Sequence, residues 1–204
     1  ILTFDTQCYG DRKGQWTGEP DAINPAGYCK PLGTSFKTIE KTAEESELNT
    51  VYLFPAMVYG NGGWFEELVH NMESGKAKVV EPGDNYLSLI HVEDLAVYYA
   101  LAAERINSSE YFNISDDRPV MQRVLVDHIA DLIGVPSPPM VSFAEYSKEF
   151  GPLAAEAMSI STRVSGIKAI DFFDYAPRQR SYETGVAYTL EKMGIKLREK
   201  EEAA

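Results

Sequence analysis

Short apolar stretches alternate with helical patterns in the first half of the chain, and this alternation limits the fold more than any other feature. The stretch Val51–Pro55 is almost wholly apolar and has the length of a strand that is buried on both faces. The chain begins with another apolar stretch, Ile1–Phe4, and Thr34–Glu47 between the two has apolar residues at helical spacing. Strands that alternate with helices predict βαβ units and a parallel sheet, so we expect an α/β fold.

The last third of the chain is richer in helical patterns and indicates a second lobe. Val120–Ile133 is amphipathic and is closed by Gly134. Three more helices are expected after it, at Glu145–Ala157, Val164–Phe173 and Tyr182–Met193. We therefore expect residues 1–115 to form a sheet domain and residues 116–204 a mainly helical lobe. Residues 78–90, which end in the expected strand Leu87–His91, are a candidate contribution to that lobe.

The net charge of −12 limits the partners of the protein. Such an acidic surface repels nucleic-acid phosphates and anionic membranes, so we expect neither as a partner. The sequence lacks the stretch of about 18 apolar residues that a membrane-spanning helix needs, and Ile1–Phe4 is too short for a signal peptide. Cys8 and Cys29 fit no metal-ligand spacing, so we expect free thiols, no metal and a cytoplasmic location. We interpret the start at Ile1, rather than Met, as a sign of a fragment.

Four segments carry the clearest motifs. Thr6–Asp11 reads Thr-Gln-Cys-Tyr-Gly-Asp, Phe54–Gly60 ends in Val-Tyr-Gly, Ile90–Ala96 reads Ile-His-Val-Glu-Asp-Leu-Ala, and Tyr111–Ile114 reads Tyr-Phe-Asn-Ile. In this order they resemble the extended short-chain dehydrogenases/reductases, the NAD-dependent epimerase/dehydratase family. Ile90–Ala96 matches that family's Ile-His-Val-x-Asp-Leu-Ala signature at every fixed position. The resemblance covers almost the whole chain and does not specify the reaction.

The resemblance implies a fold, a cofactor and a missing part. It implies the C-terminal part of a Rossmann-like doubly wound parallel sheet that binds NAD or NADP, with a small, mainly helical substrate lobe. The glycine-rich turn for the cofactor's pyrophosphate follows the first strand of such a sheet, and this sequence has no such turn. Gly60–Gly63 lies between an expected strand and helix but lacks the third glycine. We therefore expect the chain to start near the fifth strand and to be inactive on its own.

The same resemblance implies a catalytic Tyr and Lys four residues apart on one helix face, and a Ser or Thr at the end of the preceding strand. Lys37 has the place of the Lys, where it either binds the nicotinamide ribose or is simply solvated. Gly33 stands in place of the Tyr, and the nearest tyrosine, Tyr28, is either a substitute acid or a surface residue. Asp5 stands at the Ser/Thr position, and the next residue, Thr6, either orients the substrate or caps a turn. The candidate catalytic residues are Lys37, Thr6 and Tyr28.

Further candidate residues follow from the resemblance. Phe54 and Pro55 would line the nicotinamide end of the cofactor. The candidate substrate-binding residues are Tyr9, Val58, Tyr59, Tyr86 and Arg163. Arg163 would either hold an anionic group, such as a phosphate, or form an internal salt bridge. We expect His91 to form a structural hydrogen bond and Asp94 to bond the N-terminal amides of its helix.

Two functions are compatible with this pattern. The first is an NAD(P)-dependent oxidoreductase, epimerase or dehydratase that acts on a hydroxyl or carbonyl group of a small molecule such as a sugar derivative. The alternative is a regulatory protein that still binds NAD(P) and has lost catalysis, which the residues Gly33 and Asp5 at catalytic positions favour. The resemblance also implies a homodimer through the helix at residues 34–47, whose apolar residues would serve either that interface or the core.

Overall fold

A three-stranded parallel sheet lies at the centre of the larger part of the computed structural model, which describes residues 1–19, 21–25 and 29–198. Its strands are β1 (Leu2–Thr3), β3 (Val51–Pro55) and β8 (Glu110–Ile114), in the order β1-β3-β8. Leu53 in the middle strand lies opposite Thr3 on one side and Phe112 on the other. Both pairings are parallel, which confirms the α/β fold with a parallel sheet.

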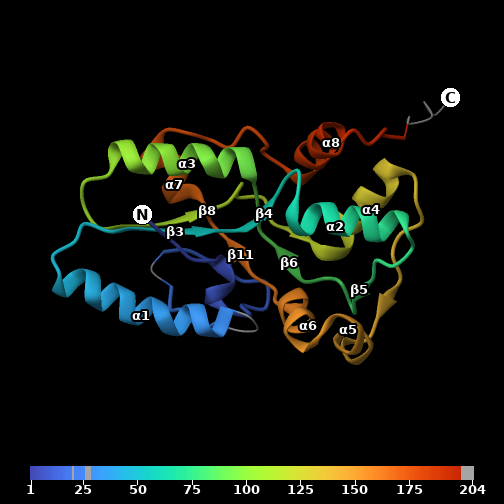
Figure 1. Ribbon diagram of the computed structural model, residues 1–204, viewed down its shortest axis with the longest axis horizontal. Coiled ribbons are helices and arrows are strands. Elements are labelled where there is room, and N and C mark those ends of the chain that lie inside the picture. The colour runs from blue at the N-terminus through green and yellow to red at the C-terminus, as the bar shows by residue number, and fades with distance from the viewer. Residues whose placement is uncertain (20, 26–28, 199–204) are drawn as a thin grey trace.

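The side chains of β3 alternate between two cores, as in any strand that is covered on both faces. Phe54 points to one face and packs with Phe36, whereas Leu53 points to the other face and packs with Tyr98. Figure 1 shows the resulting layers, with one helix below the sheet and two above it. These helices are α1 (Lys30–Glu45), α3 (Val92–Arg105) and α7 (Ile167–Phe173).

Helix α1 follows β1 and packs along the sheet. It begins at Lys30, before the expected start at Thr34, because Pro31 occupies its first turn, where a proline costs no hydrogen bond. Phe36 and Ala43 are buried, and the half-buried Ile39 packs against the same cluster. The apolar residues of α1 therefore serve the core, and a homodimer through residues 34–47 stays a prediction.

The smaller part of the molecule has its own apolar core. Phe65, Leu89, Ile129 and Leu190 are almost fully buried in it. The helices around this core are α2 (Gly63–Glu73), α4 (Gln122–Ile133) and α8 (Tyr182–Lys192), and α5 (Phe143–Phe150) and α6 (Pro152–Ser159) lie beside it. Figure 1 shows these helices gathered at one end of the molecule.

Four pairs of short strands lie outside the central sheet. Three pairs are parallel and the pair β6-β9 is antiparallel. The pairs are β2 (Trp16–Thr17) with β11 (Arg163–Val164), β4 (Met57–Tyr59) with β7 (Leu89–His91), β5 (Val79–Val80) with β10 (Met140–Val141), and β6 (Tyr86–Leu87) with β9 (Val120–Met121). The expected single strand Leu87–His91 is thus divided at Ser88, whose hydroxyl accepts a hydrogen bond from the Val164 amide at 2.8 Å.

The chain crosses between the two parts more than once. Helix α2, within residues 1–115, packs in the core of the smaller part, whereas α7, within residues 116–204, packs on the central sheet. The division at residue 115 stays a prediction of domain structure. In the described part of the chain, no helix has both the length and the apolar character that a membrane crossing requires.

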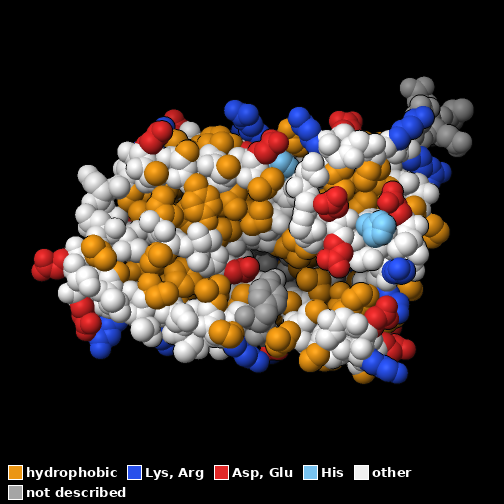
Figure 2. Space-filling view, in the orientation of Figure 1, with side chains coloured by type: hydrophobic (Ala, Val, Ile, Leu, Met, Phe, Trp, Pro, Cys, Tyr) orange, Lys and Arg blue, Asp and Glu red, His pale blue; other side chains and the backbone are white. Residues whose placement is uncertain are grey.

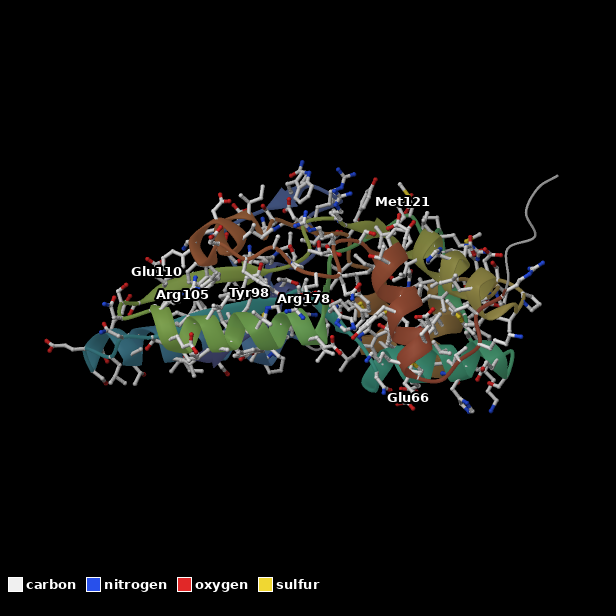
Figure 3. All side chains as sticks on the ribbon, turned by 90° about the horizontal axis from the view of Figure 1, so that it is seen from above. Glu66, Tyr98, Arg105, Glu110, Met121 and Arg178 are labelled. Carbon is white, nitrogen blue, oxygen red and sulfur yellow. The ribbon has the colours of Figure 1, made fainter. Side chains whose placement is uncertain are left out.

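The segment Ile90–Ala96 makes polar contacts that fix the start of α3. His91 Nδ1 accepts a hydrogen bond from the Glu93 amide at 3.3 Å and so caps α3, which agrees with the structural role expected for it. The role expected for Asp94 was wrong. This buried carboxylate accepts hydrogen bonds from the Tyr175 hydroxyl at 2.6 Å and the Arg178 amide at 2.8 Å, so it holds the segment after α7 rather than its own helix. Figure 3 shows Arg178 beside α3, near Tyr98.

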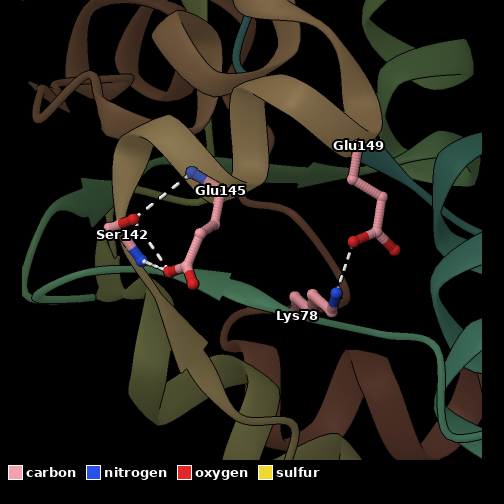
Figure 4. Close-up of polar contacts among 4 residues, drawn as sticks. All are labelled: Lys78, Ser142, Glu145 and Glu149. Carbon is pink, nitrogen blue, oxygen red and sulfur yellow. Dashed lines mark hydrogen bonds and ion pairs between the residues drawn. The ribbon is translucent and has the colours of Figure 1, made fainter.

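Polar contacts fix the start of α5 and join its last turn to the residue before β5. The Ser142 hydroxyl accepts a hydrogen bond from the Glu145 amide at 3.3 Å, and the Glu145 carboxylate accepts one from the Ser142 amide at 3.0 Å (Figure 4). This reciprocal capping box satisfies two amides that a helix start would otherwise leave unpaired. Lys78 forms an ion pair with Glu149 of the same helix (Figure 4). These contacts hold α5, and with it the neighbouring α6, near β5.

Candidate functional site

The carboxyl ends of β1 and β3 open onto a pocket of about 560 Å³, which we call the edge pocket. In parallel α/β sheets this edge is where ligands usually bind. Its walls are mostly apolar and come from the ends of β1 and β3, from α3 and from α6. The lining residues are Thr3, Phe4, Asp5, Gln7, Pro55, Ala56, Met57, Val58, Trp64, Leu95, Tyr99, Ala154, Ala157 and Met158. Figure 2 shows hydrophobic side chains gathered on the face between α3 and α1.

A 3-10 helix, η1 (Thr6–Tyr9), turns the chain away from β1 at this edge. Asp5 caps it, since its Oδ1 accepts a hydrogen bond from the Gln7 amide at 2.7 Å. The capping role considered for Thr6 thus falls to Asp5. Thr6 is buried and lines a small cavity of about 30 Å³, together with Gln7 and Met57 of the edge pocket wall. Thr6 therefore lies directly behind the edge pocket.

Lys37 lies apart from this pocket on α1, with its side chain exposed to solvent. Within the described residues it forms no hydrogen bond or ion pair, so its ammonium group is available to a ligand. Four residues before it, a Cβ atom at Gly33 would lie 2.4 Å from Cγ of Pro25. The ring of Pro25 thus fills the space beside the helix where the family's tyrosine would begin. Tyr28, the proposed substitute acid, lies outside the described residues.

The two residues expected at the nicotinamide end have different surroundings. Pro55 ends β3 and lines the edge pocket. Phe54 is buried below the sheet, where its ring stacks on Phe4 with the centroids 5.4 Å apart. The structure therefore places Pro55, and not Phe54, at the pocket. The Ala56 backbone, which follows Pro55, lines the pocket as well.

A second cavity of about 500 Å³, which we call the lobe pocket, lies next to the edge pocket and shares Met158 with it. Tyr86 and Arg163, two candidate substrate-binding residues, both line it. The Arg163 guanidinium carbon lies 3.7 Å from the centre of the Tyr86 ring, a cation–π contact. Among the described residues Arg163 forms no salt bridge, and its buried Nε has no hydrogen-bond partner. Val58, another of the five candidate substrate-binding residues, lines the edge pocket.

Tyr9 and Tyr59 line neither pocket. Tyr9 is buried, and its hydroxyl donates a hydrogen bond to Asn113 Oδ1 at 2.7 Å. Tyr59 lies in the core of the smaller part, where a Cβ atom at Gly185 would lie only 1.8 Å from its hydroxyl oxygen. Burial raises the pKa of both tyrosines, so both hydroxyls stay protonated. The structure thus brings Val58, Tyr86 and Arg163 to the pockets and leaves these two tyrosines in the interior.

Two carboxyl groups were missed as candidates although each follows a strand of the central sheet. Asp5 follows β1, lines the edge pocket and has its pKa raised by burial. Asp116 follows β8 and is buried, which raises its pKa to about 7. Its Oδ1 accepts a hydrogen bond from the Arg118 amide at 2.9 Å, whereas its buried Oδ2 has no partner in the described structure. An acidic residue two positions after the end of a parallel strand is the sequence signal that points to this edge.

Comparisons with known proteins connect this geometry to solved structures, although neither a family model nor a curated protein matches the sequence. A functionally unknown conserved protein from Silicibacter pomeroyi is 24% identical, over 93% of this chain and 65% of its own, with a TM-score of 0.79. A human epimerase family protein solved with NADPH is 16% identical, over 93% of this chain and 64% of its own, with a TM-score of 0.78. The dTDP-glucose 4,6-dehydratase of Bacillus anthracis, solved with NAD, is 17% identical, over 94% of this chain and 60% of its own, with a TM-score of 0.77.

The chain spans less than two thirds of each of these three structures. At such identities the likeness shows the fold, and it confirms the fold class expected from the sequence, the C-terminal part of a Rossmann-like sheet with a small lobe. The resemblance that the motifs carry is thus confirmed at the level of the fold. This chain has the fold of the extended short-chain dehydrogenases/reductases of the NAD-dependent epimerase/dehydratase kind.

Proposed function

We propose that this chain is part of an NAD(P)-dependent oxidoreductase, epimerase or dehydratase that acts on a hydroxyl or carbonyl group of a small molecule, such as a sugar derivative. The observation that carries the proposal is the edge pocket, an apolar pocket with few polar groups at the carboxyl edge of a parallel sheet. Two solved structures of the same fold, the human epimerase family protein and the Bacillus anthracis dehydratase, hold NADPH and NAD.

The residues at the edge pocket fit the nicotinamide end of such a cofactor. Pro55 and Ala56 provide a flat apolar wall, and the pocket volume of about 560 Å³ has room for a nicotinamide ring beside a small substrate. Lys37 lies apart from the pocket on α1, and its exposed ammonium group is suited to bind ribose hydroxyls beyond the ring. A nicotinamide cofactor, when bound, supplies a hydride donor or acceptor. The chain's own residues would bind the ring, orient the substrate and exclude water.

The pyrophosphate would bind to sequence that precedes β1 in the complete protein. Among the described strands β1 pairs with β3 alone, so its other edge is open to a further strand. An apolar hollow of about 410 Å³ adjoins this edge, with Ile1, Ile39 and Leu48 in its lining. A preceding segment would cover both the strand edge and this hollow.

The substrate would reach from the edge pocket into the lobe pocket. Thr6, behind the edge pocket, would help to orient it, while Tyr86 would pack against it and Arg163 would bind a polar or anionic group. Phe54, Tyr9 and Tyr59 are buried, so they would contribute by packing around the pockets and not by touching a ligand. A cytoplasmic location and a homodimer remain part of this proposal.

The test is dinucleotide binding and turnover by the complete protein, comprising this chain and any segment before it. Calorimetry with NAD and NADP would measure binding, and absorbance at the nicotinamide band would measure turnover with a panel of sugars and alcohols. Lys37→Ala should weaken dinucleotide binding, because a charged hydrogen bond is worth about 1.5–3 kcal/mol. Lys41→Ala is the matched control on the same helix, where Lys41 forms an exposed ion pair with Glu45. Equal binding by both variants would remove Lys37 from the site.

One observation favours a second function, a regulatory protein that binds NAD(P) without chemistry. The ring of Pro25 fills the place of the catalytic tyrosine, and Gly33 has no side chain that could act as an acid. This function predicts dinucleotide binding by the complete protein and no hydride transfer with any substrate of the panel. Reproducible formation of the reduced cofactor would exclude it.

A further inference from the structure

Asp5 is the one carboxylate among the described residues that line the edge pocket. Its neighbours in the wall include Phe4, Pro55 and Leu95, so the group faces a mainly apolar space. No described lysine or arginine forms an ion pair with it. A carboxyl group without an ion-pair partner in an apolar pocket is typical of a functional site, whereas a structural carboxylate usually has an opposite charge beside it.

The side chain of Asp5 is held in place and still has an oxygen to spare. Oδ1 accepts the hydrogen bond from the Gln7 amide at 2.7 Å, which fixes the carboxyl group at the start of η1. Oδ2 accepts no hydrogen bond from a described residue, and it is not one of the buried unpaired oxygens of the molecule. The carboxyl group is thus oriented by one oxygen and can exchange a proton through the other.

Burial raises the pKa of Asp5, and the hydrogen bond from the Gln7 amide lowers it by less. A raised pKa makes the carboxylate a stronger base and keeps it able to return the proton, which is what acid–base catalysis requires. The other titratable group of the edge pocket, Tyr99, is hydrogen-bonded to Thr3 Oγ1 at the wall. The helix position four residues before Lys37 cannot supply an acid either, because it is Gly33 and the ring of Pro25 fills the space beside it.

We propose that Asp5 is a catalytic acid–base residue that exchanges a proton with the substrate oxygen in the edge pocket. This inference rests on the proposed oxidoreductase function. In the direction of oxidation, the O–H bond of the substrate alcohol breaks and its proton goes to Asp5 Oδ2. The hydrogen on the same carbon would leave with its electron pair, and a C=O bond would form. A bound oxidised nicotinamide would supply the two-electron acceptor that this oxidation needs, and Asp5 would end protonated; reduction would follow the reverse path.

The test compares Asp5→Asn with the wild type in the complete protein. An Asn side chain can still accept the hydrogen bond from the Gln7 amide, so η1 keeps its cap. We expect kcat to fall by about 100-fold or more, the usual contribution of a general acid–base group, with dinucleotide affinity unchanged. The limb of the pH–rate profile that reports Asp5 should disappear. Asp21→Asn is the control, because the exposed Asp21 carboxylate accepts a hydrogen bond from the Gly18 amide outside the edge pocket, and kcat of this variant should stay at the wild-type level.

A second readout does not depend on turnover. Carbon-13 NMR of the aspartate carboxyl groups, assigned with Asp5→Asn, should show Asp5 titrating above its ordinary pKa of 3.8. Wild-type turnover that survives in Asp5→Asn would overturn the assignment and leave the proposed function standing. A wild type that binds dinucleotide but turns over no substrate would instead refute the proposed function, and the role of Asp5 with it.

Discussion

Replacing Asp116 by asparagine should make the protein more stable at neutral pH, and the gain should grow as the pH rises. Asp116 lies two residues after the end of β8, where it is only 6% exposed. Its Oδ1 has the Arg118 amide as a partner, but the buried Oδ2 has none in the described structure. A carboxylate in this place loses its hydration without gaining an opposite charge, which is why its pKa rises to about 7.

The sign of the effect follows from the protons bound in each state. Between pH 3.8 and about 7 the folded protein keeps Asp116 protonated, whereas the unfolded chain releases that proton. The contribution of Asp116 to the free energy of unfolding is therefore fully present below pH 3.8 and is lost as the pH rises through about 7. The two pKa values correspond to a total loss of about 4 kcal/mol, of which about 2.5 kcal/mol falls between pH 5 and pH 8. The side-chain amide of the Asp116→Asn variant stays neutral, so the variant should not show this loss.

Urea unfolding of both proteins at pH 5 and at pH 8 would measure the effect. The stability of Asp116→Asn relative to the wild type should rise by about 2.5 kcal/mol from pH 5 to pH 8. Asp171→Asn, at an exposed carboxyl group on α7, controls for the loss of one negative charge. A relative stability that is the same at both pH values, or that changes equally in the control, would refute the reasoning.

Two further predictions concern α1 and its surroundings. Gly33→Ala should destabilise the protein, because a Cβ atom 2.4 Å from Cγ of Pro25 costs about 1–3 kcal/mol of overpacking, more than the gain in helix propensity of about 1 kcal/mol. Ser35→Ala, exposed on the same helix, should change the free energy of unfolding by no more than about 0.5 kcal/mol; equal effects of the two substitutions would contradict the contact. Cys8 and Cys29 are free thiols that are only 0% and 1% exposed, so a thiol reagent should react slowly with the native protein and with two thiols per chain in denaturant. Rapid reaction of the native protein would show that this region is open.

The parallel sheet could be predicted from the sequence because its strands are marked by local pattern. The wholly apolar stretch Val51–Pro55 could be recognised as a strand covered on both faces. A strand that is apolar throughout shows no alternation of polar and apolar residues. The local sequence therefore does not indicate that Phe54 points away from the edge pocket while Pro55 lines it. The division of the strand at Ser88 was equally hidden, because it depends on a hydrogen bond to Val164, far along the chain.

The parts of the site that the sequence did not reveal depend on contacts between distant segments. Asp94 was expected to serve its own helix, yet its partners Tyr175 and Arg178 come from the segment after α7. The meaning of Gly33 became clear only from the position of Pro25. Asp5 appeared in the sequence as a departure from a pattern, whereas the pocket around it supplies the physical reason to consider it as a functional group.

The structure of the complete protein with NAD or NADP bound would test the central claim most directly. The account predicts the nicotinamide ring in the edge pocket, in contact with Pro55, with a ribose hydroxyl bound by Lys37 and with Asp5 left free to meet the substrate oxygen in the same pocket. A dinucleotide bound elsewhere on the chain, or a nicotinamide ring away from the ends of β1 and β3, would contradict it.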